Sequence, residues 1–173
     1  LETHFVSEFG YLVEQFFLLA QRGSPAIQFS RDDLADALKE LTSSLKVYRT
    51  YFVPSGETDL RWLQMAFTEV EGRGRLSSKS ALDWLRAVLL EKGDWSEATY
   101  LAIKRWEQLT GPVMAKGLED TALYRYFPLL SLNGVGCEPD WVGDGVTEFH
   151  AFNQERLRQM PLTMNATSTH DTK

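Results

Sequence analysis

The sequence has few residues that bind metals or form disulfides. Its single cysteine, Cys137, excludes an internal disulfide framework and a cysteine-rich zinc site. The three histidines, His4, His150 and His170, share no short spacing, so a histidine-based metal site is not expected. We therefore expect neither a metal nor a cofactor.

Long apolar runs and an excess of positive charge are also missing. The longest apolar run, residues 16–20, is far shorter than the roughly 20 residues that cross a bilayer. The 18 Lys+Arg residues against 24 Asp+Glu residues give a net charge of −6. Binding to a nucleic-acid backbone needs basic surface. We expect no membrane or nucleic-acid partner and, because no secretory signal is recognisable, a cytoplasmic location.

Both ends of the sequence suggest that it belongs to a longer polypeptide. The chain begins with Leu1 rather than methionine, inside what reads as a helix, and residues 169–173 stop without a Gly/Ser-rich tail or a loss of sequence complexity. A natural small protein with a processed N-terminus is the alternative.

Apolar residues recur at helical spacing along most of the 173 residues. The periodic segments are 5–19, 34–45, 60–70, 82–89, 102–109 and 149–160. This pattern predicts a mainly α fold in which short connections pack neighbouring helices antiparallel and the apolar stripes form the core. Ser30 is expected to cap the second helix together with Asp33, and Ser96 to cap the fifth.

Three segments read as strands instead. Residues 47–53 are β-branched and aromatic, residues 111–117 form a short apolar run between breakers, and residues 162–169 follow a proline. Three isolated strands cannot close a barrel, but they could be a slice of a parallel α/β barrel. In such a barrel, functional side chains gather at the C-terminal ends of the strands.

The end of the second predicted strand is the first candidate site. Lys116 and Gly117 end this strand, and Glu119 and Asp120 are expected to open a helix, where the dipole favours carboxylates. These groups could form a rim of donors and acceptors for a polyhydroxylated ligand. The alternative is a solvated helix start with ion pairs four residues apart.

Two further candidates lie near the other predicted strands. Asp171, next to His170, could stabilise positive charge on a reacting sugar carbon, or both could be surface polar residues. Arg49 could pair with a buried carboxylate and hold a site in place, or point outward from a structural strand. The sequence offers no glycine-rich phosphate loop, serine nucleophile elbow or convincing pair of catalytic carboxylates.

Three motifs in order resemble one enzyme family. They are VYRTY (47–51), TGPVMAKGLEDTALYRY (110–126) and STHDTK (168–173). Together they are similar to the maltooligosyl trehalose synthases, which are (1→4)-α-D-glucan 1-α-D-glucosylmutases of the α-amylase superfamily, glycoside hydrolase family 13. The resemblance spans most of the chain from residue 47 onward.

The resemblance implies a piece of a (β/α)8 barrel enzyme. Residues 1–110 would be a helical, bundle-like insertion domain, and residues 111–173 a partial barrel segment with a few short strands. The partners would be the remainder of the barrel and a maltooligosaccharide. The implied reaction converts the reducing-end α-1,4 linkage of a maltodextrin to an α,α-1,1 linkage.

The resemblance also implies roles for particular residues. Asp171 would stabilise the transition state, with His170 binding substrate beside it and Lys173 binding sugar on the acceptor side. Lys116 and Glu119 would hold the released glucose while it turns. The nucleophile and the acid/base would lie upstream of this chain, so the chain alone is expected to be inactive.

Aromatic residues and one loop add detail. Tyr124, Tyr126 and Trp141 could stack on sugars or belong to the core. Gly134 stands where the family usually has a loop carboxylate, which makes this loop a departure from the family pattern. The alternatives are another glycosidase of the same superfamily and a noncatalytic helical interaction module.

Overall fold

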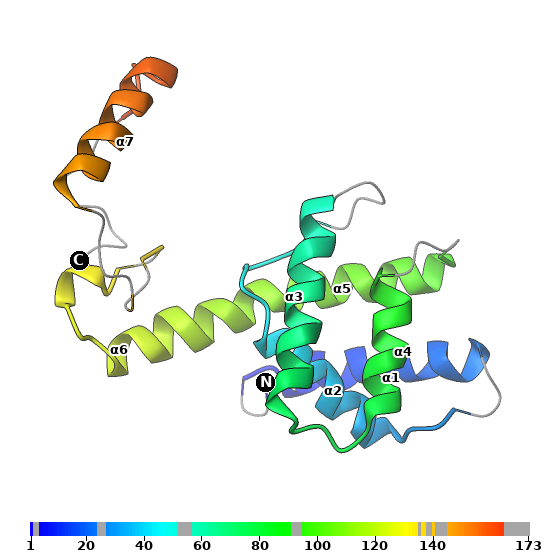
Figure 1. Cartoon of the computed structure of the whole chain (residues 1–173). Helices are drawn as coiled ribbons and strands as arrows, with labels where there is room; N and C mark the ends of the chain where they lie inside the picture. The colour runs from blue at the N-terminus through cyan, green and yellow to red at the C-terminus, as the bar shows by residue number, and fades with distance from the viewer. Residues whose placement is uncertain are drawn as a thin grey trace. The chain divides into compact units, whose positions relative to one another are not determined.

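The computed structural model describes residues 1, 4–23, 27–51, 57–90, 95–134, 136–137, 140 and 145–164. In these residues the chain is mainly helical and contains no strand (Figure 1). It divides into two compact units, Leu1–Lys116 and Gly117–Lys173. The mainly α fold class that the apolar periodicity predicts is therefore confirmed.

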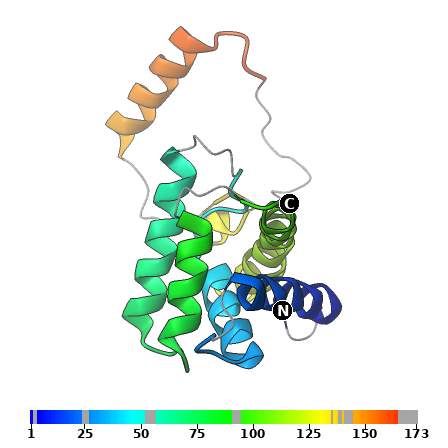
Figure 2. The same ribbon diagram turned by 90° about the vertical axis from the view of Figure 1, so that its right-hand side faces the viewer.

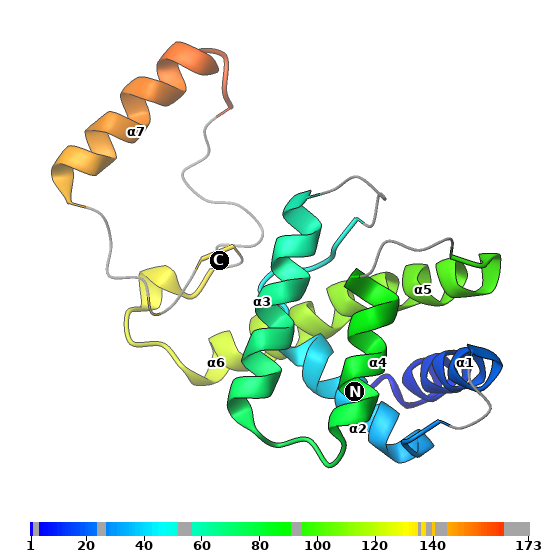
Figure 3. The ribbon, with the colours of Figure 1, turned by 45° about the vertical axis from the view of Figure 1, so that its right-hand side comes forward.

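The first unit is a cluster of helices around α2. Its helices are α1 (Val6–Gly23), α2 (Arg31–Ser43), α3 (Glu57–Arg73), α4 (Lys79–Leu90) and α5 (Glu97–Met114). Helix α2 contacts each of the other four. Helices α3 and α4 lie side by side (Figure 2), and α1 packs along α5 (Figure 3). The core of the unit therefore lies around α2.

The predicted helix starts are present. The Ser30 hydroxyl accepts a hydrogen bond from the backbone N–H of Asp33 at 3.1 Å, and the Ser30 N–H donates to the Asp33 carboxylate at 2.8 Å. This reciprocal pair is a capping box, which satisfies two backbone donors at the start of α2. The Ser96 hydroxyl likewise accepts from the N–H of Thr99 at 3.1 Å and begins α5.

The apolar stripes of the first five helices form one continuous core. The largest side chains with almost no exposed surface come from all five helices: Leu12, Phe16, Leu34, Leu38, Leu41, Leu63, Phe67, Leu82, Leu85, Leu89, Ile103 and Trp106. The ring of Trp84 packs edge-on against Phe16, with 6.2 Å between ring centroids. The predicted core of this unit is thus confirmed.

The second unit continues from the same polypeptide with short helical pieces and one longer helix. A π-helix (Ala115–Ala122) crosses the boundary and leads into α6 (Leu123–Arg125), a 3-10 turn (Leu130–Leu132) and α7 (Val146–Gln159). The amide of Asn133 donates to the carbonyls of Leu123 and Tyr126 at 2.7 and 2.8 Å. These two hydrogen bonds hold the loop around Asn133 against the C-terminal end of α6.

The three predicted strands are wrong wherever the structure describes them. Residues 47–51 are bent or have no regular structure, and residues 111–117 are helical. Leu162 lies in a turn, and residues 163–164 have no regular structure. The other residues of the first and third predicted strands, 52–53 and 165–169, lie outside the described residues. The slice of a parallel barrel expected for residues 111–173 is not visible in the described part.

Residues 111–117 are helical although Pro112 lies among them. A proline inside a helix removes one backbone hydrogen bond, which leaves the carbonyl of Gln108 without its helical partner. Pro112 and Gln108 are both exposed, so water can reach this part of the helix. The helix therefore runs through the Gly-Pro pair instead of ending there.

Helix α7 forms as predicted, but its apolar residues are not part of a core. Phe149, Phe152 and Leu157 keep 62, 64 and 68% of their surfaces exposed. The helix that this spacing predicts is therefore confirmed. The prediction that its apolar side chains are buried is wrong for the described residues.

The buried hydrogen bond of Trp106 gives a first prediction. Its indole N–H donates to the Thr42 hydroxyl at 2.9 Å, and that hydroxyl donates to the Leu38 carbonyl at 2.7 Å. Thr42→Val leaves a buried N–H without an acceptor, so the free energy of unfolding should fall by about 1–3 kcal/mol. Thr68→Val, which removes a similar hydroxyl-to-carbonyl bond on an exposed face, should change it by less than about 0.5 kcal/mol in urea denaturation.

The capping box gives a second prediction, on pH. Hydrogen bonds from the backbone and hydroxyl of Ser30, and from the Ser77 hydroxyl, hold the pKa of Asp33 below its ordinary value. A depressed pKa contributes stability above the unfolded pKa of about 4, and this contribution disappears as pH falls through the folded pKa. In Asp33→Asn, the free energy of unfolding should therefore decrease less than in the unaltered chain as the pH is lowered. Asp32→Asn, a change in the same helical turn, should not have this effect.

Candidate functional site

The VYRTY segment lies against the C-terminal half of α5. The Thr50 hydroxyl donates to the carboxylate of Glu107 at 3.2 Å, and both residues are completely buried. Lys104, one helical turn before Glu107, donates from its ammonium group to the other carboxylate oxygen at 2.9 Å. Both oxygens of this buried carboxylate therefore have a donor.

The backbone of the segment also approaches the helix closely. A Cβ atom added at Gly111 would lie 3.8 Å from the carbonyl oxygen of Tyr48, which is ordinary van der Waals contact. Residues 48–50 thus pass over α5 between Glu107 and Gly111. Two of the three motifs that carry the family resemblance meet at this point, 47–51 and the start of 110–126.

The outer side of the segment is aromatic and cationic. Tyr48 and Tyr51 expose 42 and 64% of their surfaces. The Arg49 guanidinium carbon lies 5.1 Å from the centroid of the Tyr51 ring. The Nε atom of Arg49 is buried and has no hydrogen-bond partner in the described part of the chain. Buried donors without a hydrogen-bond partner are uncommon in folded proteins.

Arg49 therefore differs from its expected role. Thr50 and Lys104 donate to the Glu107 carboxylate, while the Arg49 guanidinium lies over the Tyr51 ring. The buried carboxylate that the sequence analysis expected near this motif is present, but a hydroxyl and an ammonium group hold it.

Lys116 and Glu119 lie on the π-helix Ala115–Ala122. Lys116 is exposed and Glu119 is half-buried. The expectation that Lys116 ends a strand and that the two acids open a helix is wrong, because the backbone is helical from Glu97 onward. A π-helical stretch is uncommon and often marks a functional site. Here it coincides with the longest family-like motif.

Three predicted site residues, His170, Asp171 and Lys173, lie outside the described residues. Their predicted roles stay predictions. Trp141 also lies outside, while Tyr124 and Tyr126 are exposed rather than part of a core.

Tyr126 makes hydrogen bonds with two other residues of the second unit. The Tyr126 hydroxyl donates to the Asp140 carboxylate at 2.7 Å, and this bond raises the pKa of Tyr126 above its ordinary value. Because the Asn133 amide also binds the Tyr126 carbonyl, both ends of this residue are fixed. Asn133, next to Gly134, thus anchors the chain that follows α6.

Sequence reasoning missed Lys104 and Glu107. Glu107 follows Ile103 by four residues, so it lies on the buried stripe of α5. A carboxylate in an apolar helical stripe, with a lysine three residues earlier, is a signal for a buried charge that needs donors. Its partner Thr50 is distant in the sequence and could not be found from spacing.

No group of three His, Cys, Asp or Glu side chains among the described residues is placed to hold a metal ion. Within the same residues, none of the helices has the length and apolar character that a bilayer crossing requires.

Two curated sequences are similar to part of the chain. Both come from strains of Mycobacterium tuberculosis, and both are named "Putative maltooligosyl trehalose synthase". Each is 49% identical to the chain over 69 residues, which cover 40% of this chain and 9% of the relative. The chain therefore matches only a small part of the length of these relatives. No family model and no solved structure matches it.

The buried contact between Thr50 and Glu107 gives a third prediction. Thr50→Val removes a hydrogen bond to a charged group and should lower the free energy of unfolding by about 1.5–3 kcal/mol. It should also speed amide hydrogen exchange in residues 47–51. Thr110→Val is the matched control, because this buried hydroxyl donates only to the Glu107 backbone carbonyl at 2.9 Å. Equal exchange at 47–51 in both variants would contradict the anchoring role.

Proposed function

We propose that the chain is part of an enzyme that converts maltooligosaccharides to maltooligosyl trehaloses. The observation that carries this proposal is the 49% identity over 69 residues to the two mycobacterial sequences. The contact of the VYRTY backbone with Gly111, at the start of the second family-like motif, supports it. The catalytic polypeptide would be longer than this chain, and it would act in the cytoplasm without a cofactor.

The proposed reaction is an isomerisation in which no water is consumed. The bond between the last glucose and the rest of the maltodextrin breaks as one carboxylic acid of the longer polypeptide protonates the leaving glucose oxygen, and the dextrin is carried on a second carboxylate. The anomeric hydroxyl of the released glucose then attacks the same carbon and gives its proton back to the first carboxylate, which forms the α,α-1,1 linkage and frees the second carboxylate. Isomerisation exceeds hydrolysis only if the glucose stays bound and water is kept out.

Lys116 and Glu119 would hold that glucose. A lysine ammonium only donates hydrogen bonds and a carboxylate only accepts them, so together they suit hydroxyl groups, which do both. The two residues lie three positions apart on one π-helix. The Glu107 contact would fix the VYRTY segment beside the beginning of the same motif.

The C-terminal motif would take part in bond cleavage. Asp171 would stabilise positive charge on the reacting sugar carbon, as glycoside chemistry requires. His170 and Lys173 would bind sugar hydroxyls next to it. One carboxylate cannot perform a double displacement, so the 173-residue chain alone should show no turnover.

The test is the reaction of the complete polypeptide with maltoheptaose. We expect reducing ends to disappear while the number of glucose units per molecule stays constant. Lys116→Ala and Glu119→Gln should each raise the ratio of glucose release to isomerisation by about tenfold, since each loses a charged hydrogen bond to the held glucose. Lys79→Ala, on an exposed position of α4, is the control and should leave this ratio unchanged.

Two outcomes would contradict the proposal. Steady formation of reducing sugar by the unaltered polypeptide would indicate a hydrolase of the same superfamily. Absence of turnover on any α-glucan would indicate a noncatalytic helical module.

A further inference from the structure

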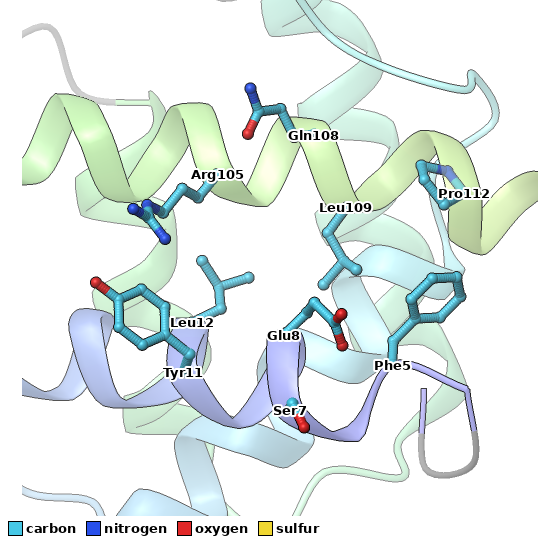
Figure 4. A pocket seen from close by; sticks show the side chains of 9 residues that line it. All are labelled: Phe5, Ser7, Glu8, Tyr11, Leu12, Arg105, Gln108, Leu109 and Pro112. Atoms are coloured by element: carbon cyan, nitrogen blue, oxygen red, sulfur yellow. The ribbon is translucent and has the colours of Figure 1, made fainter.

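A groove of about 450 Å³ lies between α1 and α5 (Figure 4). Its lining comes only from the first unit: Phe5, Ser7, Glu8, Tyr11, Leu12, Arg105, Gln108, Leu109 and Pro112. None of these residues belongs to the site proposed above. The volume is within the range of pockets that hold small molecules.

The floor and both ends of the groove are apolar. Leu12 and Leu109 are buried and lie beneath it, with Phe5 and Pro112 at one end (Figure 4). Tyr11 lies at the other end and exposes 48% of its surface. An exposed aromatic ring in a groove provides a flat surface against which a ligand can stack.

Polar groups of opposite charge line the groove, Glu8 from α1 and Arg105 from α5. The Arg105 guanidinium carbon lies 4.8 Å from the centroid of the Tyr11 ring. The Glu8 carboxylate points from α1 toward α5 (Figure 4). In the described part of the chain, Glu8 makes no hydrogen bond or ion pair, and Arg105 is held only by the ring contact. The groove therefore offers a strong acceptor and a strong donor.

This combination restricts the ligand. An apolar helix laid in the groove would bury Glu8 and Arg105 without partners, which is costly. A polyanion would meet Glu8 and a chain of net charge −6. A neutral pyranose has apolar C–H faces for the tyrosine ring and a rim of hydroxyls that both donate and accept.

We propose that this groove is a binding site for glucosyl units of an α-1,4-glucan, separate from the site that holds the released glucose. The choice of an α-glucan rests on the proposed function, whereas the choice of a neutral sugar rests on the lining alone. Tyr11 stacks on one sugar ring, while Arg105 and Glu8 bind its hydroxyls. A second contact of this kind raises the effective concentration of a long substrate near the protein.

The test is calorimetric titration of the 173-residue chain with maltoheptaose, followed by amide chemical shifts of α1 and α5. We expect binding with shifts of the groove residues. Tyr11→Ala should weaken the association about tenfold. Tyr100→Ala is the matched control, because Tyr100 is 44% exposed and its ring lies 5.6 Å from the Lys104 ammonium, but outside the groove. It should bind like the unaltered chain.

A second variant, Glu8→Ala, keeps the ring and should also weaken binding about tenfold. Helix content measured by circular dichroism should be the same in all variants, since Glu8 and Tyr11 are exposed. Absence of binding by the unaltered chain, or an affinity of Tyr11→Ala and Glu8→Ala equal to that of the unaltered chain, would overturn the proposal. Isomerisation by the longer polypeptide would then remain, which separates a failure of the groove from a failure of the proposed function.

Discussion

The carboxylate of Glu107 is completely buried, and the arrangement of the motif segments depends on how it is satisfied. A buried charge is tolerated only if donors replace water. Lys104 supplies one donor from the same helix, and Thr50 supplies the other from a segment that is 57 residues away in the sequence. The contact therefore determines where residues 47–51 lie on α5. Tyr48 of this segment also passes close to Gly111, at the start of the second family-like motif.

Much of the first unit could be predicted from the sequence, because local signals and burial agree there. Ser30 and Asp33 mark the start of α2, and the apolar residues of that helix recur at the spacing of one face. Since α2 contacts four other helices, its stripe is also the centre of the core. Where capping, periodicity and packing agree in this way, the structure of a segment can be predicted from the sequence.

The remaining features depend on context that spacing does not contain. The Gly111–Pro112 pair reads as a helix stop, yet exposure on that side of α5 lets the helix continue. Residues 47–51 have strand-like composition, but their partner is a helix. The apolar stripe of α7 predicts a core, although its side chains are exposed in the described residues. Of the candidate site, Lys116 and Glu119 were predicted from their place after an apolar run, and their roles from the family resemblance, whereas Glu107 required the coordinates.

The most direct test of this account is a double-mutant cycle between Thr50→Val and Glu107→Gln, followed by urea denaturation. If the buried contact anchors the VYRTY segment, the two changes should be non-additive, with a coupling free energy of about 1 kcal/mol or more. Additive effects within about 0.3 kcal/mol would show that Thr50 and Glu107 act independently. That result would contradict the claim that this contact holds residues 47–51 on α5.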